Sequence, residues 1–390
     1  MMILQNSPIN SRIPKFYELT IKERQDLLRK LSNLNEEDIK ILNNFGNLSM
    51  ELGDQLSENV IGAYTLPFSI ATNFRVNSKD YLIPMVTEES SVVAAASYGA
   101  KLARKHGGFT CELVQNLICG QIQILPAKKE DLVKKILTHK NSLLDKLNSS
   151  HPTLVSLGGG AKDLTLRKIA TSRGYMYILE LEVDVMDAMG ANIVNTMVEN
   201  LGEQLQSMIQ SRVLAKIVSN LTTHRLSQCR AIFDKEELGG KEIVDNILDI
   251  SAFGEVDPFR AATHNKGIMN GITALALATG NDTRAIEAAA HAYASMEGKY
   301  KPLSKYYEDN QGNLVGKISI PLAMGIVGGS TSIHPLSKIA IKILGITSAS
   351  ELIQIAGAVG LGQNLAALRA LANEGIQQAH MQLHRRKFST

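Results

Sequence analysis

The spacing of apolar and polar residues predicts helices and one strand region in the first quarter of the chain. Short helices are expected over 20–30 and 35–43, because each range begins with an N-capping residue and has an acidic side chain three positions later. A longer, Ala-rich helix is expected over 89–106, and its small residues favour close packing or close approach to a ligand. Residues 64–76 have the alternating, β-branched character of strands.

The middle of the chain has a different pattern. Strict alternation over 121–125 and 176–183 predicts two half-exposed strands, and 128–147 reads as a charged amphipathic helix between them. Residues 189–217 are expected to be mostly helical. The order strand–helix–strand–strand–helix is typical of a ferredoxin-like, split βαβ module, so we expect a small domain inserted into a larger one.

After Asn220 the chain becomes rich in small residues and predominantly helical in pattern. An Ala-rich helix is expected over 283–296, with Asp282 as its N-cap. Two strands are expected over 314–320 and 323–327, followed by one or two helices over 348–378. The chain as a whole is therefore predicted to be α+β, with a large, mostly helical domain interrupted by the small one.

Composition narrows the function classes. The 390 residues carry a net charge of +3 with no cluster of basic and aromatic residues, which argues against a nucleic-acid partner and suits an anionic small molecule. No window approaches ~18 uninterrupted apolar residues, and the N-terminus has no secretory pattern, so a cytoplasmic protein without a membrane partner is expected. Cys111, Cys119 and Cys229 lack metal-binding or disulfide spacing and are expected to be reduced.

Candidate chemistry concentrates in residues 260–271 and the Gly280-Asn-Asp282 turn. Lys266 stands among small and apolar residues, where a desolvated ammonium would need a carboxylate or an anionic ligand. Asp282 is a candidate for that partner. The alternative is a structural ion pair in a glycine-rich turn, and the segment alone slightly favours this alternative.

A second candidate is the pair Glu88-Glu89 immediately before the Ala-rich helix. Carboxylates at a helix N-terminus are stabilised by the helix dipole and free N–H groups, which explains most such pairs. The functional alternative makes one of them a general acid or base. Few cations lie nearby in the sequence, and this favours the functional interpretation without deciding between the two glutamates.

Two glycine-containing segments suggest phosphate binding. The Gly158-Gly-Gly160 run and the 184–192 segment, which follows a predicted strand, would both let backbone N–H groups approach an anion. The structural alternative for the Gly158–Gly160 run is an ordinary loop. For 184–192 it is an Asp-capped helix, which the pattern alone favours over a phosphate site. Gly360-Leu-Gly362 lacks the third glycine and the strand–helix context of a Rossmann fingerprint.

His380 and His384 lie one helical turn apart near the C-terminus. Two such residues can bind a metal, but no third ligand is evident, so no metal site is predicted and a metal hydrolase is a weak alternative. Partly exposed histidines are the commonest finding at such a position. A proton donor is the functional alternative.

Together these segments resemble the class II, soluble form of 3-hydroxy-3-methylglutaryl-CoA reductase. Eight motifs occur in the family's order over nearly the whole chain. They are Glu58-Asn-Val-Ile-Gly62, residues 85–97, Asp187-Ala-Met-Gly-Ala-Asn192, residues 262–271, Gly280-Asn-Asp282, Val327-Gly-Gly329, residues 359–364 and residues 374–381. The resemblance implies reduction of a thioester to an alcohol by two hydride transfers, interconverting 3-hydroxy-3-methylglutaryl-CoA and mevalonate plus CoA in the mevalonate pathway of isoprenoid biosynthesis.

The resemblance also implies four catalytic roles. Lys266 would stabilise the developing oxyanion, and Glu89 would donate a proton to the carbonyl oxygen. Asp282 would hold and tune Lys266. His380 would protonate the departing CoA thiolate. The family positions that contact the substrate correspond to Arg260, Ser91 and Asn270, with Asn220, Gln363 and Asn364 in matching motifs.

The family's nicotinamide dinucleotide is bound by the small domain. The phosphate loop would contain Asp187, Met189, Gly190 and Asn192. Family members that prefer NADH tend to carry Asp at the position that reads the adenosine ribose, where this chain has His151. A histidine can donate to a 2′-phosphate, so NADPH is the predicted cofactor, and NADH is the second cofactor that the site could accept.

The resemblance also sets the expected domain limits and assembly. The large domain is expected over 1–112 and 221–375, the small domain over 113–220, and the start of a C-terminal flap over 376–390. The family's flap continues for about 50 residues beyond the catalytic His, the size of a small helical unit. A homodimer or a higher oligomer of dimers is implied. The alternative function is a catalytically silent CoA- or nucleotide-binding homologue that lacks the flap.

Overall fold

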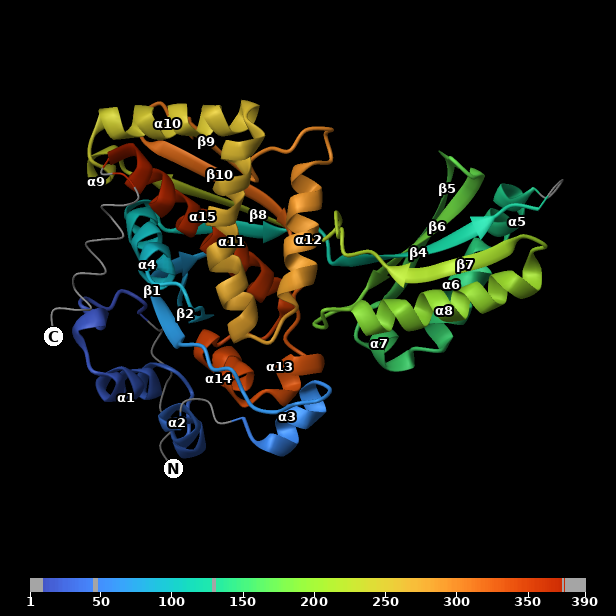
Figure 1. Cartoon of the computed structure of the whole chain (residues 1–390), viewed down its shortest axis with the longest axis horizontal. Helices are drawn as coiled ribbons and strands as arrows, with labels where there is room; N and C mark the ends of the chain where they lie inside the picture. Colours follow the sequence, from blue (N-terminus) through green and yellow to red (C-terminus); the bar gives the residue numbers. More distant parts are fainter. Residues whose placement is uncertain (1–9, 45–47, 128–130, 374, 376–390) are drawn as a thin grey trace.

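The structure, a computed structural model, describes residues 10–44, 48–127, 131–373 and 375. Two β-sheets organise these residues, and each has its own hydrophobic core. Figure 1 shows the smaller sheet and its helices standing apart from the larger body, joined to it by two crossings of the chain. This confirms the predicted α+β class with a small ferredoxin-like unit, while the exact domain limits stay a prediction.

The larger body contains a six-stranded sheet in the order β2-β1-β3-β8-β10-β9, in which only β1 and β3 pair in parallel. Its strands are β1 (Phe68–Val76), β2 (Lys79–Val86), β3 (Phe109–Leu113), β8 (Leu226–Phe233), β9 (Ser304–Glu308) and β10 (Leu314–Pro321). The chain leaves this sheet after β3 and returns to it at β8. These two strands are neighbours in the sheet, but the whole small unit lies between them in sequence.

The helices of the larger body form two groups along the chain. Those before the small unit are η1 (Phe16–Glu18), α1 (Ile21–Leu31), α2 (Glu36–Asn43), α3 (Met50–Leu56), α4 (Val92–Ala103) and η2 (Arg104–His106). Those after it are α9 (Lys235–Leu238), α10 (Lys241–Val256), α11 (Pro258–Ala278), α12 (Thr283–Ala294), α13 (Gly329–Ile333), α14 (Pro335–Leu344) and α15 (Ala349–Asn373). The predicted helices at 20–30 and 35–43 are confirmed as α1 and α2, and both begin with a complete capping box.

Helix α15 is the centre of the large core and packs against α4, α11 and β8. It is long and apolar enough to cross a membrane, but 78% of its apolar window is buried inside the fold, as expected for a core helix. At Gly99 of α4 an added Cβ would lie 2.0 Å from the carbonyl oxygen of Gly362, so the two helices touch backbone to backbone. The small residues of α4 therefore serve close packing in this structure.

The smaller sheet has the order β5-β6-β4-β7, which is the ferredoxin-like arrangement of a βαββαβ chain. Its elements are β4 (Leu117–Leu125), α5 (Leu132–Thr138), α6 (Lys140–Ser149), α7 (Pro152–Ser156), β5 (Gly160–Thr171), β6 (Gly174–Asp184), α8 (Ala191–Met208) and β7 (Arg212–Val218). The helix predicted over 128–147 is two helices that meet at His139, and residues 128–130 lie outside the described part.

Helix α8 confirms the expectation that 189–217 is mostly helical, but residues 212–217 are in strand β7, because α8 ends at Met208 without a glycine or proline to mark the stop. Two sequence expectations about elements are wrong. Strand β8 lies in a region expected to be helical. Residues 323–327 form no strand and make one isolated bridge, from Val327 to Ala188 of the small unit, because Gly325 packs on the backbone of that unit.

The expectation that all three cysteines are reduced is also wrong, because Cys111 and Cys229 form a disulfide. They are directly opposite each other in the antiparallel pair β3–β8, with Cα atoms 4.1 Å apart. A separation of 118 residues gives no sequence signal for such a pair. The bond links the strands from which the small unit departs, and closing a loop of this size stabilises a fold by about 4–5 kcal/mol in the chain-entropy view.

Candidate active site

Lys266 and Glu89 form the central contact of the predicted catalytic set. Lys266 lies in the middle of α11, and Glu89 lies in the turn between β2 and α4, both of which pack against α11. The Lys266 Nζ atom donates to Glu89 Oε2 at 3.0 Å. The two residues are 177 positions apart in sequence, so the fold brings together two segments that were predicted separately.

This pair is open to solvent, with 61% of the Lys266 side chain and 38% of the Glu89 side chain exposed. The expectation of a desolvated lysine is therefore wrong for this conformation. Exposed ion pairs contribute about 0–1 kcal/mol to stability, so the pair does little to hold the fold. It places a cation and a carboxylate side by side at a surface that a substrate can reach.

Asp282 does not contact Lys266 in this chain. About 18 Å of helix separates Lys266 from Ala278 at the end of α11, since each helical residue rises about 1.5 Å. Asp282 instead caps α12, where its Oδ1 atom accepts from the backbone N–H groups of Arg284 and Ala285. The Arg284 Nε atom lies 3.5 Å from the same oxygen. The sequence-based pairing of Asp282 with Lys266 within one chain is wrong.

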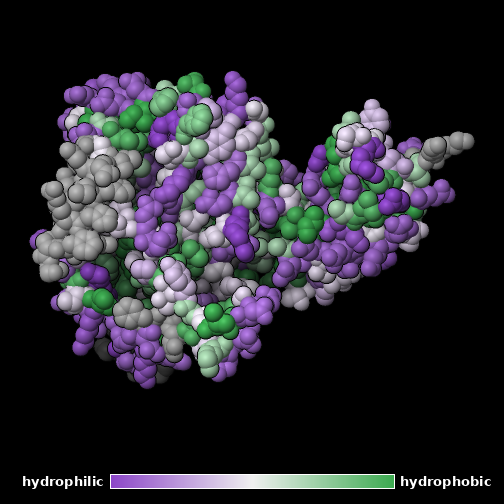
Figure 2. Space-filling model, in the orientation of Figure 1, coloured by the Kyte–Doolittle hydropathy of each residue, from purple (hydrophilic) through white to green (hydrophobic). Residues whose placement is uncertain are grey.

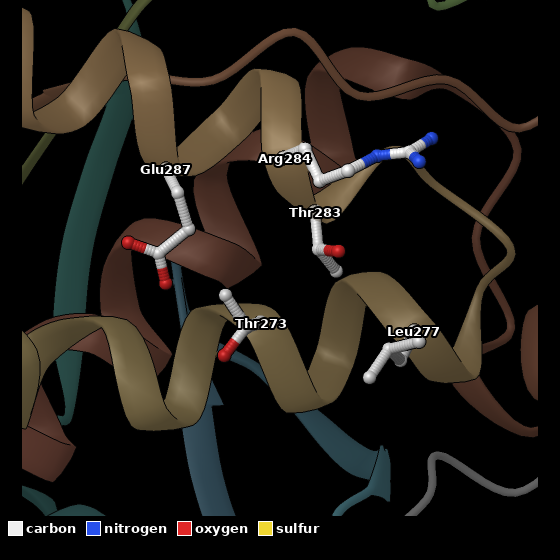
Figure 3. Close-up of a pocket in the computed structure, with 5 residues that line it drawn as sticks. All are labelled: Thr273, Leu277, Thr283, Arg284 and Glu287. Atoms are coloured by element: carbon white, nitrogen blue, oxygen red, sulfur yellow. The ribbon is translucent and has the colours of Figure 1, made fainter.

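An open hollow of about 440 Å³ lies beside Asp282, between α11 and α12. Figure 3 shows Thr283 and Glu287 on α12 pointing toward α11, which carries Thr273 and Leu277, while the Arg284 side chain extends away from α11. Of the predicted catalytic residues that the structure describes, which are Glu89, Lys266 and Asp282, none lines it. Asp282 therefore belongs to a different part of the surface from Lys266 and Glu89.

The turn that carries Glu89 is conformationally unusual. Ser91, which directly precedes α4, has φ 81° and makes no side-chain capping bond. A left-handed serine costs free energy, and such residues cluster at functional sites. Glu89 is fixed at its backbone, where its N–H donates to Thr87 Oγ1 at 3.1 Å.

Arg260 is a half-buried cation near the start of α11. Its backbone N–H is held by Asp257, but its guanidinium forms no ion pair with any described residue, and its Nε atom is buried without a partner. Burial lowers the pKa of Arg260. A guanidinium in this state suits a carboxylate or phosphate ligand. Asn270, one turn after Lys266 on the same helix, is partly exposed.

His264, between Arg260 and Lys266 in sequence, belongs to the core. It is 1% exposed, and its Nε2 atom bonds Ser304 Oγ at 2.6 Å. Burial, helped by the charge of Arg260, lowers the pKa of His264 to about 4, so the ring is neutral near pH 7. Asn364 is a buried member of the same hydrogen-bond network, and its Oδ1 accepts from Ser304 Oγ and Tyr306 Oη.

Gln363 and Asn364 are 4% and 1% exposed, so neither offers a free surface to a substrate in this conformation. Gln363 Oε1 has no hydrogen-bond partner among the residues that the structure describes, while the Asn364 side chain is hydrogen-bonded within the internal network. Their roles as substrate contacts stay predictions. Asn220 is exposed and lines a small crevice of about 10 Å³ with Met189 of the predicted cofactor loop.

The two glycine-containing segments lie at one end of the small sheet. Gly160 and Asp184 are register partners in the pair β5–β6, so the loops at 158–160 and 184–192 are neighbours. Gly190 precedes α8 with φ 106°, and an added Cβ would lie 2.8 Å from Val185 Cγ2. No side chain in the described part of the chain caps α8, which leaves the N–H groups of its first turn for an anion. These features fit the diphosphate of a dinucleotide.

His151 lies at the start of α7, one short helix before the Gly158–Gly160 run. Its Nδ1 atom bonds the carbonyl oxygen of Leu147 at 3.1 Å, which makes Nδ1 the protonated nitrogen. The Nε2 atom has no partner among the described residues. Lys162, which the sequence analysis did not single out, donates to the carbonyl oxygens of Gly158 and Gly159 and orders the glycine run.

Asp187 anchors the cofactor loop to the large unit. Its Oδ1 accepts from the backbone N–H of Ala349, at the first residue of α15, and its carbonyl oxygen accepts from Ile326 N–H. Asn192 is exposed in the first turn of α8. His380 and His384 lie outside the described residues. The roles of all these site residues stay predictions.

Comparison with known proteins identifies the family of this chain. The family model for hydroxymethylglutaryl-coenzyme A reductase matches residues 20–385. The 3-hydroxy-3-methylglutaryl-coenzyme A reductase of Archaeoglobus fulgidus is 50% identical over 98% of this chain and 87% of its own length. The probable 3-hydroxy-3-methylglutaryl-coenzyme A reductase of Borreliella burgdorferi is 38% identical over 96% of this chain and 85% of its own.

Solved structures show the same relationship. A class II 3-hydroxy-3-methylglutaryl-CoA reductase from Streptococcus pneumoniae, bound to NADPH in open conformations, superposes with a TM-score of 0.88 at 40% identity, over 92% of this chain and 99% of that one. A second structure of the reductase from the same organism gives 0.89 at 40% identity, over 95% of this chain and 90% of that one. The chain belongs to the hydroxymethylglutaryl-coenzyme A reductase family.

Proposed function

We propose that this protein is an NADPH-dependent reductase that interconverts 3-hydroxy-3-methylglutaryl-CoA and mevalonate plus CoA, in the mevalonate pathway. The observation that carries the proposal is the Lys266–Glu89 contact of 3.0 Å, a polar pair at an accessible surface that contributes little stability. In the reductive direction two NADPH and two protons are consumed for each thioester converted to an alcohol and a free thiol.

The nicotinamide supplies the hydride in each of the two reductions. Lys266 stabilises the negative charge that develops on the thioester oxygen, because its ammonium is already held in place by Glu89. Glu89 relays to this oxygen a proton taken up from solvent. Arg260, Ser91 and Asn270 bind the hydroxymethylglutaryl group, with the unpaired guanidinium of Arg260 facing an anionic part of the substrate. His380 protonates the departing CoA thiolate.

We propose further that the complete site needs two copies of the chain. Asp282 and the cofactor loop are neighbours: Asn281 holds Gly325 through two hydrogen bonds, and Gly325 packs on the amide of Met189. Lys266, which contacts Glu89, lies far from Asp282, in the middle of α11. One chain therefore offers a cofactor half-site with Asp282 and a separate substrate half-site, and a homodimer would bring the two halves together.

Exposed apolar side chains support this assembly. Ile61 and Tyr64 are 104% and 89% exposed, and Val256 and Phe259 are 82% and 85% exposed. Figure 2 shows a group of apolar residues over α3 and its neighbourhood, with hydrophilic residues beside it. Large apolar residues in such numbers are typical of surfaces that another chain covers.

The silent binding homologue, the alternative from the sequence, receives no support from the comparisons. We also propose a cytoplasmic location. Within the described residues, the helix long and apolar enough to span a membrane is a core helix, and both the substrate and the cofactor are water-soluble.

The choice of cofactor gives the first test. We expect NADPH to be oxidised with a kcat/KM at least ~10-fold above that for NADH, because the His151 ring leaves Nε2 free to face the 2′-phosphate, and an adjacent phosphate favours the imidazolium form that donates from Nε2. His151→Asp should reverse the preference, since a carboxylate repels the phosphate and accepts from a 2′-hydroxyl. The measurement is loss of nicotinamide absorbance with each cofactor.

His139→Asp is the matched control, because His139 makes the same Nδ1 contact to a carbonyl oxygen four residues earlier but lies between α5 and α6. It should leave the preference unchanged. An NADH-preferring wild type would contradict the role of His151 and leave the catalytic proposal standing.

A further inference from the structure

Arg225 is the largest fully buried side chain in the described structure, with no exposed surface. It lies just before β8, where the chain re-enters the large sheet, and its side chain reaches back to the cofactor loop of the small unit. Its guanidinium donates to the carbonyl oxygens of Met189 at 3.0 Å and Ala188 at 3.2 Å. A longer contact of 3.5 Å reaches the carbonyl oxygen of Met186.

Arg225 forms no ion pair with any described residue. Burial lowers the pKa of Arg225 to about 10, while the more distant charges of Asp184 and Asp187 oppose that shift, so the side chain is still charged near pH 7. A buried charge without a direct counter-ion is costly, and an apolar side chain of similar volume is often more stable at such a site. Stability alone therefore does not account for an arginine here.

The loop that Arg225 holds is clamped from two sides. The carbonyl groups of Ala188 and Met189 point at Arg225, so the N–H groups of the residues that follow point away from it, as trans peptides require. On that other side Gly325 packs so closely that an added Cβ would lie 2.3 Å from Met189 N. Asn116 adds a third constraint, because its Nδ2 donates to Asp184 and to the Met186 carbonyl.

We propose that Arg225 is a positioning residue for the dinucleotide site, which fixes the 186–190 loop so that the N-terminus of α8 meets the cofactor phosphates in one orientation. This inference rests on the proposed function. Met186 has φ 54°, an unfavourable conformation for a side-chain-bearing residue, which the loop keeps only while its surroundings hold it. Arg225 acts through the backbone and does not touch the cofactor.

Only arginine suits this geometry. Its planar fork presents several donors at fixed directions and can bond carbonyl groups of successive residues at once. Lysine keeps the charge but offers a single nitrogen, and methionine keeps the approximate volume but offers no donor. Comparing Arg225→Lys with Arg225→Met therefore distinguishes the contribution of the positive charge from that of the planar arrangement of N–H donors.

The test measures KM for NADPH and for 3-hydroxy-3-methylglutaryl-CoA, together with hydrogen exchange of the unliganded protein. For Arg225→Met we expect KM for NADPH to rise roughly tenfold or more, with KM for the thioester within about twofold of wild type. Exchange should accelerate at the amides of Ala188 and Ile326, which are hydrogen-bonded within or to this loop. Arg225→Lys should fall between Arg225→Met and wild type.

Arg104→Met is the matched control. Arg104 is also a largely buried arginine with two backbone or hydroxyl partners and an ion pair to Asp80, but it lies in the large unit. It should lower the melting temperature and leave both KM values unchanged. If Arg225→Met does not fold, the same measurements on Arg225→Lys decide the matter.

The inference would be overturned by a folded Arg225 variant that has the wild-type KM for NADPH and the wild-type rates of hydrogen exchange at the amides of Ala188 and Ile326. The exchange measurement needs no turnover, so it also separates two failures. A wild-type protein without reductase activity would refute the proposed function, and faster loop exchange in Arg225→Met would then still show that Arg225 orders the loop.

Discussion

The Lys266→Ala variant should lose about 10³-fold in turnover while its melting temperature changes by only a few degrees. Removal of one preorganised oxyanion donor typically costs about 10²–10³-fold in kcat, and Lys266 also holds the proton donor Glu89. The small stability change follows from exposure, because a solvent-accessible ion pair contributes about 0.2–1 kcal/mol. Rates come from NADPH oxidation at saturating substrates, and stability comes from thermal unfolding.

Lys301→Ala is the control for this variant. Lys301 forms an exposed ion pair with Glu297 at 2.7 Å, comparable in length and exposure to the Lys266 pair but away from it in sequence. It should keep turnover within about twofold of wild type, as most surface substitutions do. A Lys266→Ala enzyme that retained a tenth of its activity would refute the oxyanion role.

A heterodimer of one Lys266→Ala chain and one Asp282→Asn chain should recover about half of the wild-type activity, although each parent homodimer is nearly inactive. If each site takes Lys266 from one copy and Asp282 from the other, a two-fold dimer of these chains contains one doubly substituted site and one intact site. Asparagine caps helices as well as aspartate does, so Asp282→Asn should keep α12 in place.

The experiment uses co-expressed chains with different affinity tags, so that only the heterodimer is assayed. If Lys266 and Asp282 acted within a single chain, both sites of the heterodimer would carry a substitution, and its activity would stay at the level of the parents. That result would leave the reductase proposal intact and remove the two-copy site. A heterodimer of Lys266→Ala with Glu89→Gln is the internal control, because both residues belong to one half-site and each chain lacks one of them.

The sequence predicted the elements whose ends carry local signals. Capping boxes mark α1 and α2, and Asp282 marks the start of α12. The small unit was predicted from its alternating strands, and the βαββαβ order then restricts the sheet to few topologies. Its last strand, β7, was missed because a β-branched run directly after a helix can continue either structure.

The candidate site was predicted as a set of residues but not as a geometry. Asp282 follows Lys266 closely in sequence, but the length of α11 separates the two residues in space. The carboxylate that contacts Lys266 is that of Glu89. Arg225 carries no motif, since its role depends on carbonyl groups of another segment. The disulfide likewise depends on the register between β3 and β8, which no spacing rule supplies.

The most direct test of the central claim is the stoichiometry of the wild-type reaction. NADPH oxidation and release of free CoA thiol are followed together after addition of 3-hydroxy-3-methylglutaryl-CoA to the purified protein. We expect two NADPH oxidised for each thiol released, with mevalonate as the other product. A folded protein that binds both ligands but oxidises no NADPH, or that releases thiol without oxidising NADPH, would contradict the account.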